Sequence, residues 1–86
     1  MKIGIGSDHA GFALKTAVVE YLTEQGYEVE DFGTHSEASM DYPDVAHPVA
    51  AAVDHQKLPR AVLICGSGEG VCMTANKYAG VRAALV

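Results

Sequence analysis

The chain has 86 residues, 49% of them hydrophobic, and carries a net charge of −5 at pH 7. This length allows one domain at most, and a domain of this size buries only about 60–65% of the surface of its unfolded chain. The hydrophobic content excludes intrinsic disorder, and the acidic charge argues against a nucleic-acid surface, which requires a basic face.

The first part of the chain predicts a strand followed by a helix. Residues 2–6 form a short apolar run with strand character, and residues 10–25 repeat apolar side chains at helical spacing. The expected apolar stripe of this helix consists of Leu14, Val18, Tyr21 and Leu22. Gly26 stands where a glycine in the left-handed conformation commonly ends a helix.

The middle of the chain predicts a strand over residues 27–32, a polar loop over residues 33–42 and a helix over residues 44–55. Pro48 complicates this helix, because a proline past the first turn removes a backbone hydrogen bond. A helix that begins near His47 would instead place Pro48 at its favourable first position. We therefore expect a kinked helix or a late start.

The last part predicts a linker over residues 57–60, a strand over residues 61–65, a short helix over residues 71–78 and a fourth strand over residues 81–86. Strands that alternate with helical crossovers form a parallel sheet with helices on both faces. We expect an α/β protein with a three-layer α/β/α, Rossmann-like architecture, truncated after its fourth strand. Residues 1–86 would form a single, incomplete domain.

A glycine-rich loop follows the third predicted strand. Cys65 ends this strand, and the loop continues as Gly66, Ser67, Gly68, Glu69 and Gly70. Such a loop directs backbone N–H groups inward and opens into a helix N-terminus, which suits an anion and favours a thiolate beside it. Ser67 either shapes the turn or faces a ligand. The simplest interpretation of Glu69 is a solvated loop residue, and that of Cys72 is helix packing.

A second loop, Ser7–Gly11, follows the first strand and contains Asp8 and His9. These residues either cap the first helix or belong to a site. Because ligands bind beyond the carboxyl ends of parallel strands, we expect this loop and Cys65 to meet at one edge of the sheet. A buried structural role for Cys65 is the alternative, and Tyr42 either packs or covers a ligand.

The common phosphate-binding fingerprints fail on spacing. A dinucleotide motif that begins at Gly66 would need a glycine at position 71, where the chain has Val71. The segment from Gly6 to Gly11 has the glycine spacing of a P-loop, but Phe12 stands where the lysine is required. A nucleotide-binding function would therefore rest on architecture alone.

Features that bear on location and metal binding are few. Residues 1–8 turn polar too early for a secretory signal peptide, and no apolar run approaches the length of a membrane span. Cys65 and Cys72 without a secretion signal indicate reduced thiols, so we expect a cytoplasmic protein. No metal is expected, because the histidines outside the second loop lack metal-ligand spacing. They are His35, His47 and His55.

Five segments in chain order carry a family resemblance. They are Gly6–Phe12, Asp31–Thr34, Asp41–Pro43, Leu63–Gly68 and Ala75–Lys77. Together they resemble the ribose-5-phosphate isomerase B family, sugar-phosphate isomerases that also include the galactose-6-phosphate isomerase subunits. The resemblance covers essentially the whole chain, which corresponds to the N-terminal half, or a little more, of the family's chain.

The resemblance implies aldose–ketose isomerisation through a cis-enediolate, without a cofactor or a metal. Cys65 is the implied base that moves a proton between C1 and C2, and Ser67 with the amides of residues 66–70 forms the implied anion hole. One branch of the family uses a glutamate directly after the loop, and Val71 at that position favours Cys65. The implied substrate-binding residues are Asp8, His9, Tyr42, Gly66, Gly68, Glu69 and Gly70. Asp8 would hold sugar hydroxyls, and His9 the phosphate or a hydroxyl.

The family's ring-opening histidine, the asparagine beside it and its phosphate-binding arginines lie beyond the part of the family that this chain matches. We therefore expect the 86-residue chain alone to lack isomerase activity. The resemblance also implies a homodimer or higher homo-oligomer with a site shared between subunits. It implies the sheet order 2-1-3-5-4, so that the fourth strand would lack its proper neighbour here and one edge of the sheet would be open.

Three functions stay open at this point. The first is isomerisation of ribose 5-phosphate to ribulose 5-phosphate, with allose and galactose phosphates as alternative substrates. The second is an inactive fragment that binds a phosphate ligand or a partner protein. The third is a flavodoxin-like nucleotide-binding module, and the absent phosphate fingerprints count against it.

Overall fold

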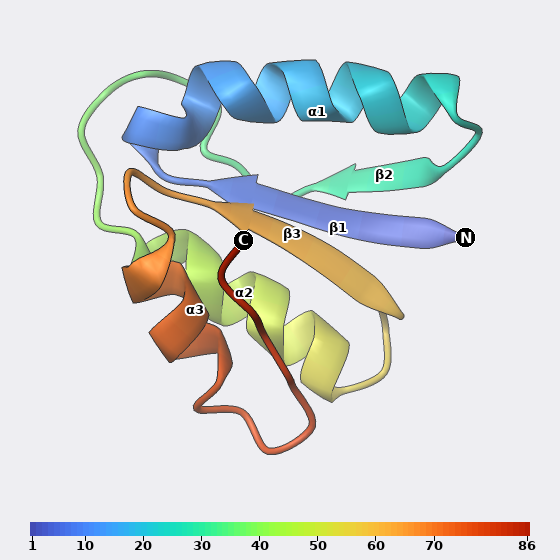
Figure 1. Ribbon diagram of the computed structural model, residues 1–86, viewed down its shortest axis with the longest axis vertical. Coiled ribbons are helices and arrows are strands. Elements are labelled where there is room, and N and C mark those ends of the chain that lie inside the picture. Colours follow the sequence, from blue (N-terminus) through green and yellow to red (C-terminus); the bar gives the residue numbers. More distant parts are fainter.

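The computed structural model describes all residues, 1–86, and contains one parallel sheet (Figure 1). Strands β1 (Lys2–Ser7), β2 (Glu28–Asp31) and β3 (Arg60–Ile64) pair in the order β2-β1-β3. The strands are close to their predicted positions. Their order agrees with the order that the family resemblance implies for them.

Helices cover both faces of this sheet and complete three layers (Figure 1). A 3₁₀ turn at His9–Gly11 leads into α1 (Phe12–Glu24), which lies on one face. Helices α2 (Pro43–Asp54) and α3 (Glu69–Ala75) lie on the other face, and α3 begins before the predicted Val71. The predicted α/β class and the three-layer architecture are confirmed. None of the helices has the length and apolarity that crossing a membrane requires.

The central strand β1 is buried on both faces. Because side chains alternate along a strand, Ile3 and Ile5 point to one face while Gly4 and Gly6 point to the other. A Cβ added to Gly6 would collide with Val45 of α2, so the helix packs directly on the backbone of the strand. The remaining buried hydrophobic residues of this side are Ala46, Val49, Ala50, Leu58, Val71 and Ala75.

The predicted apolar stripe of α1 is wrong at Leu14 and Tyr21, whose exposed fractions are 58% and 60%. Lys15 is instead buried at 2% exposure. This lysine takes the place of a core side chain because Asp31 at the end of β2 pairs with its ammonium group. Leu14 lies at a groove along the free edge of β3. A charged residue therefore decides which side of α1 faces the sheet.

Helix α2 begins at Pro43 and continues through Pro48, so the predicted late start near His47 is wrong. The carbonyl of Tyr42 accepts hydrogen bonds from the N–H groups of Val45 and Ala46, at 3.2 and 3.0 Å. These bonds close the first turn before Pro48 is reached. Pro43 occupies the first turn, where a missing N–H costs nothing.

The predicted fourth strand over residues 81–86 is wrong. This segment has no regular secondary structure and does not join the sheet. The Asn76 side chain pairs with the backbone of Ala83 instead, accepting from its N–H at 2.9 Å and donating to its carbonyl at 3.0 Å. An alternating pattern forms a strand only where a neighbouring strand offers backbone partners, and here a side-chain amide supplies them. β3 therefore keeps one free edge.

Candidate functional site

Three loops meet at the carboxyl ends of the strands: residues 8–11, 33–42 and 65–68 (Figure 1). The Asp8 N–H donates to the carbonyl of Ile64 at 3.1 Å and so joins the first loop to the last residue of β3. A Cβ added to Gly11 would lie 2.6 Å from Ile64 Cγ2. The two chemically capable loops of the sequence therefore lie side by side.

The thiol of Cys65, the residue that follows β3, is half-buried and accepts a hydrogen bond. The Gly68 N–H donates to its Sγ at 3.0 Å. Gly68 adopts the left-handed conformation with φ +80°, which turns the loop back onto the sulfur. The loop therefore directs a backbone N–H at the sulfur beside the start of α3.

The rest of the glycine loop offers further donors. Ser67 Oγ accepts from the Glu69 N–H at 3.2 Å, which shapes the turn and leaves the hydroxyl proton free to donate. The amides of Gly68 and Glu69 thus already have acceptors within the loop. The amides of Gly66, Ser67 and Gly70 have no acceptor within the protein. An anion at this loop would find several donors in place.

Asp8 is buried and caps the turn that precedes α1. Its Oδ1 accepts from the Gly11 N–H at 3.0 Å, so the capping interpretation describes this oxygen. Its Oδ2 makes no hydrogen bond within the protein. One carboxylate oxygen therefore holds the loop, and the other is available to a hydroxyl group.

Segment 33–42 connects the two loops. Met40 lies against the His9 ring, with its N at 3.1 Å and its carbonyl oxygen at 3.2 Å from His9 Nδ1. Further along, the Tyr42 ring lies over Gly70, where an added Cβ would be 2.6 Å from Tyr42 Cζ. One segment therefore contacts His9 through Met40 and the glycine loop through Tyr42. The side chain of Glu69 is exposed and makes no hydrogen bond.

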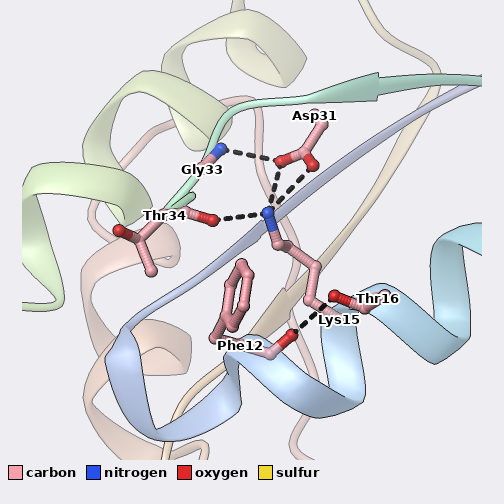
Figure 2. A network of polar contacts seen from close by, with 6 residues as sticks. All are labelled: Phe12, Lys15, Thr16, Asp31, Gly33 and Thr34. Carbon is pink, nitrogen blue, oxygen red and sulfur yellow. Dashed lines mark hydrogen bonds and ion pairs between the residues drawn. The ribbon is translucent and has the colours of Figure 1, made fainter. Parts of the chain in front are cut away.

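The sequence analysis assigned no role to Lys15 and Asp31, whose ion pair lies next to this segment (Figure 2). The lysine side chain is 2% exposed, and the Asp31 carboxylate is 35% exposed. Lys15 Nζ donates to both Asp31 carboxylate oxygens and to the Thr34 carbonyl. Burial opposes ionisation of Asp31, but hydrogen bonds from Lys15 and from the Gly33 N–H outweigh it and lower the pKa of Asp31. The sequence feature that could have indicated this pair is a lysine among the apolar residues of a predicted helix.

This network predicts a pH-dependent stability difference between the wild-type chain and Asp31→Asn. A carboxyl group whose pKa is lowered on folding stabilises the folded state above its unfolded pKa of about 3.9 and loses this effect as pH falls. In urea unfolding, wild type should exceed Asp31→Asn most at pH 6–7, and the difference should shrink below about pH 4. A difference that does not change with pH would contradict the assignment.

A groove of about 670 Å³ extends from the thiol loop along β3. It is lined mainly by apolar residues of β3, α2, α3 and segment 81–86, with Cys65, Ser67 and Gly68 at its polar end. This end offers backbone and hydroxyl donors, and the side chains of Arg60 and Arg82 also line the groove. No group of three or more His, Cys, Asp or Glu side chains comes together to hold a metal ion.

Comparison with known proteins gives consistent matches over the whole chain. A sequence model of the Ribose/Galactose Isomerase family matches residues 3–86. The chain is 48% identical over 84 residues to the Escherichia coli protein named ribose-5-phosphate isomerase B. That match covers 98% of this chain and 56% of the relative.

Solved structures agree with this comparison. The Clostridium thermocellum ribose-5-phosphate isomerase B structure matches with a TM-score of 0.95 and 52% identity. The Mycoplasma genitalium ribose-5-phosphate isomerase B structure, with bound ribulose-5-phosphate, matches with a TM-score of 0.92 and 46% identity. These matches cover 98% and 99% of this chain but 57% of each structure. The chain thus spans little more than half the length of the relatives that it matches.

Proposed function

Because the chain belongs to the ribose/galactose isomerase family, we propose that it carries the proton-transferring part of a site that interconverts an aldose phosphate and a ketose phosphate. The proposed pair is ribose 5-phosphate and ribulose 5-phosphate. The names of the Escherichia coli and Clostridium thermocellum relatives support this pair, as does the ribulose-5-phosphate bound to the Mycoplasma genitalium protein. Family members of full length would act as homodimers or higher homo-oligomers.

One observation carries the proposal: the Gly68 N–H donates to Cys65 Sγ within a loop that keeps other amides free. A base that removes a proton from carbon needs to exist as a thiolate, and a donor to sulfur stabilises that form. The negative charge that then develops on the substrate oxygen needs preorganised donors. The free amides of Gly66, Ser67 and Gly70, with the Ser67 hydroxyl, would supply them.

The proposed step balances without an external reagent. The Cys65 thiolate removes the proton from C2 of the open-chain aldose, the electron pair forms the C1=C2 bond, and O1 becomes the oxyanion. The thiol then returns the proton to C1 while a proton moves from O2 to O1, which leaves a carbonyl group at C2. Asp8 Oδ2 would accept from a sugar hydroxyl, His9 would contact the phosphate or a hydroxyl, and Tyr42 would line the pocket. Glu69 would lie at the rim of the glycine loop that surrounds the substrate.

The proposal is tested with a chimaera that joins this chain to the part of the Escherichia coli relative that follows the matched segment. We expect the chimaera to convert ribose 5-phosphate to ribulose 5-phosphate, and the 86-residue chain alone to show no turnover. Allose 6-phosphate, galactose 6-phosphate and nucleotides serve as competing ligands. A folded chimaera that turns over no sugar phosphate would contradict the proposal, and nucleotide binding would favour the flavodoxin-like alternative.

The role of Ser67 gives a second expected result in the chimaera. Removal of one anion-hole donor raises the barrier by about 2.7–4 kcal/mol, so Ser67→Ala should lower kcat by roughly 10²–10³-fold and change KM little. Ser67→Thr keeps a hydroxyl group and is the matched control. An unchanged kcat in Ser67→Ala would mean that the hydroxyl only shapes the turn through its bond from the Glu69 N–H.

A further inference from the structure

The buried Lys15 ammonium group has all of its donors used by two neighbouring elements. Its Nζ lies 2.8 and 2.9 Å from the Asp31 carboxylate oxygens and 2.5 Å from the Thr34 carbonyl oxygen (Figure 2). It also lies 5.4 Å from the centre of the Phe12 ring, a cation–π distance. A lysine is rarely buried without such partners, because burial of an unpaired charge is costly.

The Asp31 carboxylate holds more than the lysine. Its Oδ1 also accepts from the Gly33 N–H at 2.8 Å. The Lys15–Asp31 pair therefore hydrogen-bonds segment 33–42 at two points, at Gly33 through Asp31 and at Thr34 through Lys15. Ser7 continues the attachment: its N–H donates to the Gly33 carbonyl at 2.7 Å, and its carbonyl accepts from the Thr34 N–H at 2.8 Å. The start of the segment is therefore fixed next to Asp8.

The middle of the segment has little support of its own. Between Thr34 and Met40 the only hydrogen bond is from the Ala38 N–H to Ser36 Oγ, at 3.3 Å. Residues 35–39 are also exposed. At the far end, the Tyr42 carbonyl is held by the N–H groups of Val45 and Ala46 at the start of α2. The contact of Met40 with His9 has no such support, so it depends most on how firmly the near end is held.

We propose that the Lys15–Asp31 pair is a positioning element, which fixes the start of segment 33–42 and, through the Met40 contact, orients His9 toward the substrate. Lys15 touches neither the thiol loop nor His9 and acts through the backbone of Gly33 and Thr34. The predicted effect of the Lys15–Asp31 pair on sugar-phosphate binding rests on the proposed function. The predicted effect on the free chain does not, because the contacts of the pair all lie within the chain.

The test uses NMR of the 86-residue chain without substrate. In Lys15→Met, the backbone order parameter at Met40 should fall from about 0.85 to below about 0.6, while that of Tyr42, which α2 holds, should stay at about 0.85. The ring nitrogen shifts of His9 should change as the Met40 contact is lost. The backbone order parameters of the central strand β1 should stay as in wild type. Lys2→Met is the matched control, because it removes the exposed Lys2–Glu30 pair, which joins β1 to β2 at 3.0 Å.

Asp31→Asn provides a second variant, since its amide oxygen still accepts from the Gly33 N–H while the ion pair is lost. It should lower the order parameter of Met40 in the same direction, and this result tests the proposal if Lys15→Met fails to fold. Unchanged order parameters and His9 shifts in the folded variants would overturn the proposal. So would loosening spread evenly over β1 and segment 33–42, since it would indicate a general stabilising role.

A ligand measurement separates this inference from the proposed function. Where the wild-type chain binds ribulose 5-phosphate, Lys15→Met should weaken binding by about tenfold or more and Lys2→Met by less than twofold. Unchanged affinity in a Lys15→Met chain with a loosened segment would overturn the link to substrate. Absence of binding by the wild-type chain and the chimaera alike would count against the proposed function and leave the NMR result standing.

Discussion

Replacement of Cys65 by alanine in the chimaera is expected to lower kcat for ribose 5-phosphate by about 10³-fold, within the range that a positioned general base contributes. Without the thiol, the only basic side chain of the glycine loop is the carboxylate of Glu69, which is exposed and has no hydrogen bond to position it. The donors that remain, the free amides and the Ser67 hydroxyl, can stabilise an oxyanion but cannot form it. Initial rates at saturating ribose 5-phosphate measure the effect.

The second cysteine gives the matched control. Cys72 is also half-buried and unpaired, but its Sγ lies against the Ala83 carbonyl at 3.6 Å, away from the free amides of the loop. Cys72→Ala should therefore leave kcat within about twofold of wild type, as substitutions away from a reacting centre commonly do. Near-normal turnover in Cys65→Ala, with contamination by host isomerase excluded, would remove Cys65 from the role of base.

The second large effect concerns stability. Gly6→Val is expected to lower the free energy of unfolding of the 86-residue chain by about 3 kcal/mol or more. Its new side chain would occupy the space of Val45 and would also meet Val49 Cγ2, which lies 3.1 Å from the position of a Cβ. Both valines are buried, so neither can swing into solvent. Overpacking of a core costs about 1–3 kcal/mol or more, a large part of the roughly 5 kcal/mol expected for a small domain.

Urea unfolding followed by circular dichroism measures this effect, with Gly66→Ala as the control. A Cβ on Gly66 would have only the Ala10 Cβ nearby, at 3.9 Å, so its stability should stay within about 0.5 kcal/mol of wild type. Gly6→Ala should lie between the two. A stable, folded Gly6→Val chain would show that α2 does not pack directly on β1.

The alternation of strand and helix patterns was sufficient to predict the class, the layers and the position of each of the three strands. Gly26 ends α1 with φ +89°, as its place after the helical pattern predicted. The meeting of the Asp8 and Cys65 loops was also predictable, because the carboxyl ends of parallel strands share one edge. The catalytic and binding roles of these residues stay predictions.

What could not be predicted depends on partners distant in the sequence. Periodicity predicts that Leu14 is buried against the sheet, but the structure exposes Leu14 and buries Lys15. This exchange depends on the Asp31 carboxylate, which pairs with Lys15 from 16 residues away. The same holds for residues 81–86, which have no neighbouring strand and whose Ala83 backbone groups pair with the Asn76 side chain instead. Local patterns report what a segment prefers, whereas a buried charge or an edge strand is decided by what lies opposite.

The contact between Leu85 and Gly68 links two parts of the molecule that the fold otherwise separates. Leu85 Cδ1 occupies the place beside Gly68 where a side chain would begin, 2.5 Å from the position of a Cβ. The same glycine donates its N–H to the Cys65 sulfur. A shift of Leu85 would therefore change the packing around the residue that donates to the sulfur. We expect the alkylation rate of Cys65 by a thiol reagent to change when the position of residues 81–86 changes.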